Sequence, residues 1–246
     1  MKGIIAVCGK GGVGKTTISA LLCRLVLEKE GIRGLAIDAD PGGGLSQALA
    51  LPVKKSVNDL RGQIITSAGE EKGNRATLAA SIDYQLWESL TEYRNLAFLS
   101  VGRPEEEGCY CQVNSLLREA IHLLAEQFDV VIIDAEAGIE QVNRRVIDYI
   151  DQLILVSDLS VKGVRVAESI REVAVRNLKI NQVQLLLNRV SQAREGKNVE
   201  KIAGLSDLPV LGWLPEDETV FDFDFNEHSF LQFSDTPVMQ TIRSLF

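Results

Sequence analysis

Short runs of apolar residues recur along the chain and alternate with segments of helical periodicity. The apolar runs are nearly continuous, which is typical of parallel strands buried on both faces. They predict strands at residues 3–8, 34–38, 96–101, 129–134, 152–157, 183–188 and 209–214. Apolar positions three and four residues apart predict helices at about 15–30, 114–127, 162–176 and 236–245. This alternation predicts a doubly wound α/β fold, with a mostly parallel sheet and helices on both of its faces.

Two segments depart from this alternation. Residues 52–95 are polar and irregular, and we expect them to form a mobile excursion at the carboxyl side of the strands. In residues 221–228, FDFDFNEH, apolar and acidic residues alternate, which favours a strand or a loop near a ligand over a second metal site. Since the chain has no internal repeat or low-complexity segment, we expect residues 1–246 to form one domain.

Composition and charge disfavour several classes of protein. Of the 246 residues, 46% are hydrophobic and 24% are charged, which suits a large soluble domain. The formal net charge is −8, whereas non-specific nucleic-acid binding depends on basic patches. The apolar runs are too short to span a bilayer, and the N-terminus has no signal-peptide cleavage pattern. We therefore expect a cytoplasmic protein without membrane or nucleic-acid partners.

A glycine-rich segment follows the first predicted strand and opens the first predicted helix. Residues 9–16, GKGGVGKT, fit the pattern G-x-x-x-x-G-K-[ST] in the strand–helix context that the pattern requires, and predict a P-loop NTPase. Lys15 is expected to reach the β- and γ-phosphates, Thr16 to ligate Mg²⁺, and Thr17 to bind the α-phosphate. Backbone N–H groups converge on phosphate oxygens in such loops. We assign those contacts to Gly9, Gly11, Gly12, Val13 and Gly14.

The lysine directly after Gly9 indicates which type of P-loop this is. With Lys10 the loop reads KGGVGKT, which resembles the deviant Walker A loop of the family that includes septum-site MinD, plasmid-partition ParA and nitrogenase iron protein. The resemblance implies a homodimer in which Lys10 contacts nucleotide across the interface and takes part in catalysis.

Three carboxylates follow two of the predicted strands. Asp38 and Asp40 belong to AIDADP, and Asp134 belongs to VVIIDAEAG, so all three are expected beside the phosphates at the carboxyl edge of the sheet. The resemblance implies that Asp40 positions the attacking water, that Asp38 supports the Mg²⁺ shell, and that Asp134 is the Walker B carboxylate for Mg²⁺. An aspartate at a strand end can also be only a helix cap.

Two later strand ends carry polar residues that match the same family. Asn188 and Arg189 end LLLNRV, and Pro215 and Asp217 belong to WLPEDETV. The equivalent Asn and Pro-x-Asp segments of the family hold adenine, so the resemblance implies that these four residues bind ATP or ADP. The expected strand end has no N-K-x-D guanine motif, which agrees with ATP as the substrate of hydrolysis.

The four cysteines fall into two groups. Cys8 lies in an apolar strand and Cys23 in an amphipathic helix, so both are expected to be buried thiols. Cys109 and Cys111 stand one residue apart before a helix, where they could pack, form a disulfide or bind metal. A reducing compartment disfavours the disulfide, and a helix N-terminus favours thiolate. Two thiolates leave a metal ion half-coordinated, but a two-fold dimer would supply four.

The segments around this cysteine pair resemble one branch of the family. GCYCQVNSLLREAI and DAEAGIEQ are similar to CooC-type ATPases, which mature carbon monoxide dehydrogenase and acetyl-CoA synthase, and the likeness runs from Met1 to about Leu214. It implies an ATP-dependent nickel metallochaperone that couples ATP hydrolysis and dimerisation to metal delivery into a client nickel enzyme. Cys109 and Cys111 of both chains would carry Ni²⁺, although Zn²⁺ also accepts thiolates.

Other functions remain open at this point. A positioning or regulatory ATPase like MinD or ParA would share the loop, but Arg243 is the one basic residue of the C-terminal PVMQTIRSLF, and membrane-surface helices are rich in Lys and Arg. Four thiolates in a dimer could also hold a bridging iron–sulfur cluster for electron transfer. Scaffold ATPases for nascent clusters use a C-x-x-C near the C-terminus, which this chain lacks.

Overall fold

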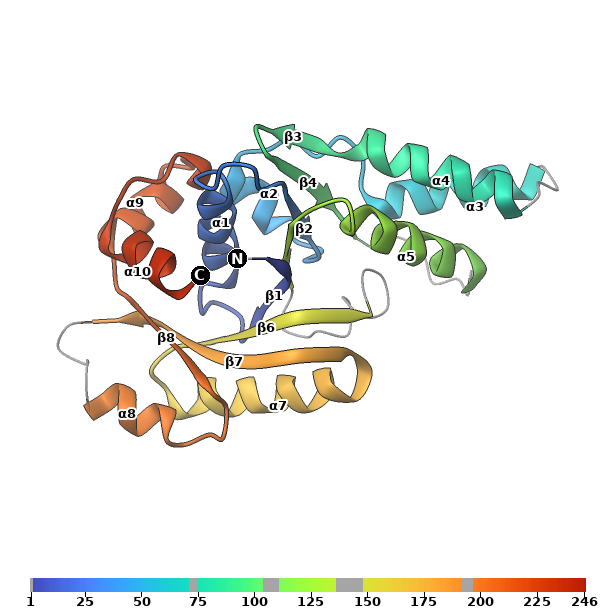
Figure 1. Cartoon of the computed structure of the whole chain (residues 1–246). Coiled ribbons are helices and arrows are strands. Elements are labelled where there is room, and N and C mark those ends of the chain that lie inside the picture. The colour runs from blue at the N-terminus through green and yellow to red at the C-terminus, as the bar shows by residue number, and fades with distance from the viewer. Residues whose placement is uncertain (1, 71–74, 104–110, 136–147, 192–196) are drawn as a thin grey trace.

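A computed structural model describes residues 2–70, 75–103, 111–135, 148–191 and 197–246 (Figure 1). The described chain forms an eight-stranded sheet in the order β3-β4-β2-β5-β1-β6-β7-β8. β3 pairs with β4 in antiparallel fashion, and every other pairing is parallel. The strands are β1 (Gly3–Gly9), β2 (Gly34–Asp38), β3 (Thr91–Tyr93), β4 (Leu96–Ser100), β5 (Val130–Asp134), β6 (Tyr149–Ser157), β7 (Lys179–Val190) and β8 (Val210–Pro215).

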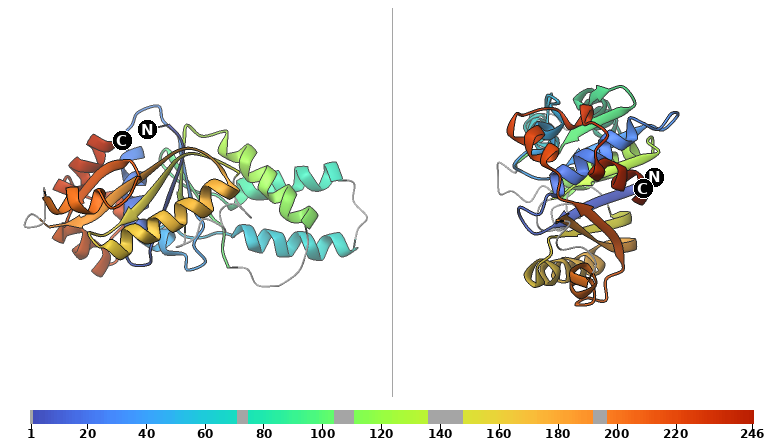
Figure 2. Two further views of the ribbon diagram at one scale, coloured as in Figure 1. Left: turned by 90° about the horizontal axis from the view of Figure 1, so that it is seen from below. Right: turned by 90° about the vertical axis from the view of Figure 1, so that its left-hand side faces the viewer.

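Helices cover both faces of this sheet (Figures 1 and 2). They are α1 (Lys15–Val26), α2 (Gly44–Leu49), α3 (Val57–Glu70), α4 (Arg75–Ser89), α5 (Cys111–Ala125), α7 (Val161–Asn177), α8 (Lys197–Ala203), α9 (Glu218–Phe225) and α10 (Pro237–Leu245), with a short 3₁₀ helix, η2 (Phe230–Gln232). The doubly wound α/β fold and all seven predicted strands are confirmed. The four predicted helices correspond to α1, α5, α7 and α10.

The alternation of side chains along β1 separates two apolar cores. Ile5 and Val7 face α1, α2, η2 and α10, whereas Ala6 and Cys8 face the core shared with α3, α4, α5 and α7. Because successive residues of a strand point to opposite faces, near-continuous apolar runs are needed to fill both cores. No helix in the described ranges is both long and apolar enough to cross a membrane.

The prediction for residues 52–95 was wrong. Two helices, α3 and α4, and the edge strand β3 form there. The helices α3, α4 and α5 project away from the sheet as a helical arm (Figures 1 and 2). The apolar positions that hold the arm are few and separated by polar residues, so the segment has a weak helical pattern. Leu60 and Ile64, and likewise Ile82 and Leu86, lie four residues apart and are buried in the core shared with α5.

The alternating segment 221–228 also differs from its prediction, since residues 218–225 form helix α9. Asp217 caps this helix by accepting a 3.0 Å hydrogen bond from the N–H of Thr219. Phe223 packs against Phe230 and Phe233, with ring centroids 5.8 and 4.9 Å apart. A local cap and one partly buried aromatic residue therefore outweigh the period of two in the sequence.

Candidate nucleotide site

The phosphate loop runs from Gly9, at the end of β1, to the start of α1, and two of its glycines have no room for a side chain. A Cβ on Gly9 would lie 2.4 Å from the carbonyl oxygen of Val156 on β6. Gly14 has φ 95°, and a Cβ there would lie 2.4 Å from Nδ2 of Asn188. Both positions therefore require glycine, because of close contacts with strands distant in the sequence.

Two residues at the end of β7 hold the loop from outside. Asn188 is buried and donates a 2.8 Å hydrogen bond from Nδ2 to the carbonyl oxygen of Val13. Arg189, with a left-handed φ of 57°, donates from Nη1 to the carbonyl oxygen of Gly12 at 3.2 Å. These bonds occupy carbonyl oxygens, so they do not compete with phosphate for the N–H groups of the loop. Asn188 and Arg189, both predicted to bind nucleotide, thus lie beside the loop. Their hydrogen bonds to the loop's own backbone were not predicted from the sequence.

Lys15 and Thr16 lie at the N-terminus of α1. Lys15 donates a 3.3 Å hydrogen bond from Nζ to the carbonyl oxygen of Lys10, which keeps the ammonium group over the loop. Thr16 donates from Oγ1 to Oδ2 of Asp134 at 2.8 Å. Since a hydroxyl has one proton and two lone pairs, Thr16 can keep this bond and still offer a lone pair to a cation.

Asp134 ends β5, beside β1, and only 1% of its surface is exposed. Its second oxygen, Oδ1, accepts a 2.9 Å hydrogen bond from the hydroxyl of Ser19. Burial raises the pKa of Asp134 to about 6, although the bonds from Thr16 and Ser19 act to lower it. Ser19 was missed in the sequence, but its position three residues after Thr16, on the same side of α1, could have identified it.

Asp38 stands opposite Asp134 in the register of β2 and β5, and it is fully buried. Its carboxylate accepts hydrogen bonds from the backbone N–H groups of Asp40, Leu45 and Ser46, at 3.2, 3.1 and 3.2 Å. Burial, and then the charge of Asp134, raise the pKa of Asp38 to about 7. Asp38 therefore fixes the turn between β2 and α2 in addition to carrying charge.

Asp40 lies in that turn and is partly exposed. Its Oδ1 accepts a 2.7 Å hydrogen bond from the N–H of Gly42, and its charge acts to raise the pKa of Asp134. Thr16 and Asp134 thus share a hydrogen bond beside the phosphate loop, and the charges of Asp38, Asp40 and Asp134 act on one another, although the three carboxylates are not arranged as a metal-binding cluster. Oxygen atoms suit Mg²⁺, which binds through one or two carboxylates together with phosphate oxygens and water, and a divalent cation would relieve the repulsion among these carboxylates.

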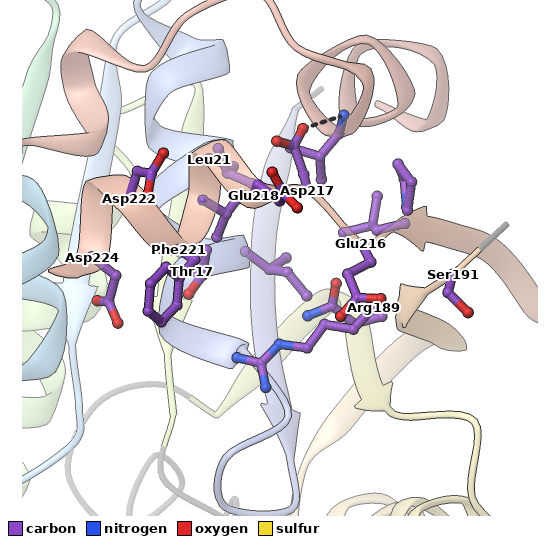
Figure 3. A pocket seen from close by; sticks show the side chains of 16 residues that line it. Thr17, Leu21, Arg189, Ser191, Glu216, Asp217, Glu218, Phe221, Asp222 and Asp224 are labelled. Carbon is purple, nitrogen blue, oxygen red and sulfur yellow. Dashed lines mark hydrogen bonds between the residues drawn. The ribbon is translucent and has the colours of Figure 1, made fainter.

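A cavity of about 1080 Å³ opens beside α1 (Figure 3). The predicted base-binding residues Asn188, Arg189, Pro215 and Asp217 all line it, together with Thr17. The Asp217 carboxylate is already engaged, since Oδ1 caps α9 and Oδ2 accepts a 3.4 Å bond from the N–H of Val238. The structure brings these residues together, and their contact with adenine remains a prediction.

The two groups of cysteines have different outcomes. Cys8 and Cys23 are free thiols with no exposed surface, as expected, and burial raises the pKa of both, that of Cys8 to about 12. Cys109 lies outside the described residues, and Cys111 is the first residue of α5. Within the described ranges no group of three or more His, Cys, Asp or Glu residues is arranged to hold a metal ion. The metal site at the cysteine pair therefore stays a prediction.

A phosphate loop at the end of a parallel strand, with a buried aspartate hydrogen-bonded to its threonine, defines a nucleotide-binding P-loop protein. The chain belongs to the CobQ/CobB/MinD/ParA nucleotide-binding family, whose profile matches residues 4–230. This is a family of nucleotide-binding ATPases.

Individual relatives match nearly the whole chain. An uncharacterised ATP-binding protein of Methanocaldococcus jannaschii is 34% identical over 225 residues, covering 90% of this chain and 87% of the relative. The carbon monoxide dehydrogenase accessory protein CooC of Rhodospirillum rubrum is 31% identical over 226 residues, covering 88% and 84%. The Mg-ADP complex of MinD from Pyrococcus horikoshii shares the fold, with a TM-score of 0.67 and 23% identity over 100% of this chain and 94% of that one.

Proposed function

We propose that this protein is a cytoplasmic, ATP-dependent nickel metallochaperone that works as a homodimer. Its client would be an enzyme of the carbon monoxide dehydrogenase or acetyl-CoA synthase type. The observation that carries the proposal is the C-x-C pair, whose second cysteine, Cys111, is the first residue of α5, in a chain 31% identical to a carbon monoxide dehydrogenase accessory protein over 88% of its length. In the proposed dimer, Cys109 and Cys111 of each chain supply four thiolates to the transported ion.

The nucleotide site of each protomer would bind and hydrolyse ATP. Lys15 moves from the Lys10 carbonyl to the β- and γ-phosphates, and Lys10 reaches the nucleotide of the partner. Thr16, Asp134 and Asp38 would hold Mg²⁺, which neutralises charge on the phosphate oxygens when bound. Asp40, on the partly exposed turn after β2, orients the attacking water.

Hydrogen bonds connect the turn that carries Asp40 to the chain that leads into the cysteine pair. The N–H of Val101, just after β4, donates to the carbonyl oxygen of Asp38 at 2.8 Å. Arg103 donates from Nε to the carbonyl oxygen of Pro41 at 2.9 Å. A shift of the turn on nucleotide binding or hydrolysis would therefore act on Val101 and Arg103, which precede the cysteine pair in the sequence. This contact supports coupling between nucleotide state and the capture or release of metal.

Anaerobic native mass spectrometry tests the proposal directly. The protein is mixed with nickel, with ADP or a non-hydrolysable ATP analogue and without nucleotide, and wild type is compared with Cys109→Ser/Cys111→Ser. Cys23→Ala is the matched control, since it removes a buried thiol outside the proposed site. We expect one nickel per dimer in wild type and in the control, and none in the double variant. Cys109→Ser should still hydrolyse ATP.

Each other outcome points to a different function. Nucleotide-dependent dimers without metal would contradict the nickel role and favour a positioning or regulatory ATPase. An iron–sulfur mass that depends on Cys109 and Cys111 would indicate a cluster-bearing ATPase. Loss of ATP hydrolysis in a folded Cys109→Ser variant would show that the nucleotide and metal sites are not separate.

A further inference from the structure

Helix α9 carries three phenylalanines in two different environments. Phe223 is partly buried, packs against the core residues Phe230 and Phe233, and anchors the helix. Phe221 and Phe225 lie one turn apart, stack on each other with ring centroids 5.8 Å apart, and are 66% and 74% exposed. Large aromatic side chains favour burial, so two neighbouring exposed rings indicate a surface that meets a ligand or a partner.

The position of Phe221 indicates which part of a ligand it would contact. Phe221 lines the cavity beside the phosphate loop, together with Thr17, Asn188 and Pro215, whereas Phe225 does not line it (Figure 3). Thr17 belongs to the first turn of α1, so the cavity extends from the phosphate loop to α9. A ring at its wall is within reach of the part of a nucleotide that extends away from the phosphates.

The cavity and the phosphate loop differ in the charge of their side chains. Of the described lining residues, Arg189 alone is a cation, and five are carboxylates: Glu216, Asp217, Glu218, Asp222 and Asp224. Phosphates would be repelled here, while Lys15 and the N-terminus of α1 attract them at the loop. A neutral base has no such penalty, and every nucleobase offers a flat face for an aromatic ring.

We propose that Phe221 is the stacking platform for the nucleobase. The inference rests on the nucleotide-binding part of the proposed function and assigns to α9 a role in holding the base. An exposed apolar ring in the free protein is then expected, since the base would cover the side of Phe221 that faces the cavity. Phe225, one turn further along α9 and outside the cavity lining, is the matched control.

Isothermal titration with ADP and with inorganic tripolyphosphate separates the base from the phosphates. Phe221→Ala should raise the Kd for ADP about tenfold and leave that for tripolyphosphate within about twofold. Phe221→Tyr, which keeps the ring, should retain ADP affinity, and Phe225→Ala should change it by less than about twofold. Unchanged ADP affinity in Phe221→Ala would overturn the inference, as would equal weakening of ADP and tripolyphosphate.

A spectroscopic measurement gives a second readout. In Phe221→Trp the new indole should be quenched by ADP but not by tripolyphosphate, relative to the signal of Trp87 and Trp213 in wild type. An unquenched indole in a variant that binds ADP would contradict stacking. If wild type binds no ADP, both the proposed function and this inference fail; if wild type binds ADP and the Phe221 variants behave like it, the inference alone fails.

Discussion

The phosphate loop and the helical arm, formed by α3, α4 and α5, are stabilised in opposite ways. The loop is held by individual polar contacts, such as those from Asn188 and Arg189 to its carbonyl oxygens, and by glycines that no other residue can replace. The arm is held by apolar side chains from three helices, among them Leu60 and Leu86, buried in a common core. The loop therefore depends on the identity of each residue, whereas the arm depends on volume and apolarity and tolerates change.

The largest effect is expected from the loop, in Lys15→Ala. The ammonium group bonds only the Lys10 carbonyl in the described structure, so its loss should barely affect folding. Removal of a charged donor to phosphate should weaken ADP binding by about a hundredfold. Titration calorimetry measures the affinity, and Lys55→Ala, at an exposed position outside the loop, is the control. If Lys15→Ala bound ADP with the affinity of wild type, the loop would not be part of the nucleotide site.

Leu86→Ala, in the arm, is expected to lower the stability of the protein and to leave its affinity for ADP nearly unchanged. Leu86 is 1% exposed, and truncation of such a side chain lowers the free energy of unfolding by about 2–5 kcal/mol. ADP affinity should remain within about twofold, since Leu86 is not among the described residues that line the cavity beside the loop. Tyr84→Ala, at an exposed position two residues away, should cost less than about 1 kcal/mol. Urea unfolding and ADP titration of the same samples make the comparison, and a tenfold loss of affinity in Leu86→Ala would show that the regions are coupled.

In protein free of metal and nucleotide, Asp134→Asn is expected to increase the free energy of unfolding, by less than Leu86→Ala lowers it. Since the pKa of Asp134 is raised to about 6, its carboxyl group binds more protons in the folded protein than in the unfolded chain between about pH 4 and pH 6, so the free energy of unfolding falls as pH rises through this range. The amide carries no charge to desolvate, so the variant should exceed wild type at pH 8 by about 2 kcal/mol. The advantage should disappear near pH 4. Urea unfolding with a chelator at both pH values measures the difference, with Asp207→Asn, at an exposed position, as the control. A wild type whose free energy of unfolding rises up to pH 8 would contradict the cost of burying the Asp134 charge.

Local patterns predicted the strands and the phosphate loop, because short-range rules determine both. The contact between Asn188 and Val13 could not be predicted, since it depends on how β7 is placed beside the loop. The arm was missed for a similar reason: Leu60 and Ile64 on α3, and Ile82 and Leu86 on α4, are buried only because they share a core with α5. In α9 the period of two in FDFDF was misleading, because the Asp217 cap and the packing of Phe223 against Phe233 decide the conformation.

The bond between Asn188 and Val13 spans 175 residues, and this has a consequence for the protein during its synthesis. A nascent chain exposes its phosphate loop first, and the side chain that braces the loop leaves the ribosome only 175 residues later. Until then the loop lacks the support of β7, so tight capture of nucleotide should wait for the synthesis of this strand. Chains that stop before β7 would thus compete little for cellular ATP, and nucleotide occupancy would mark molecules in which β7 is in place.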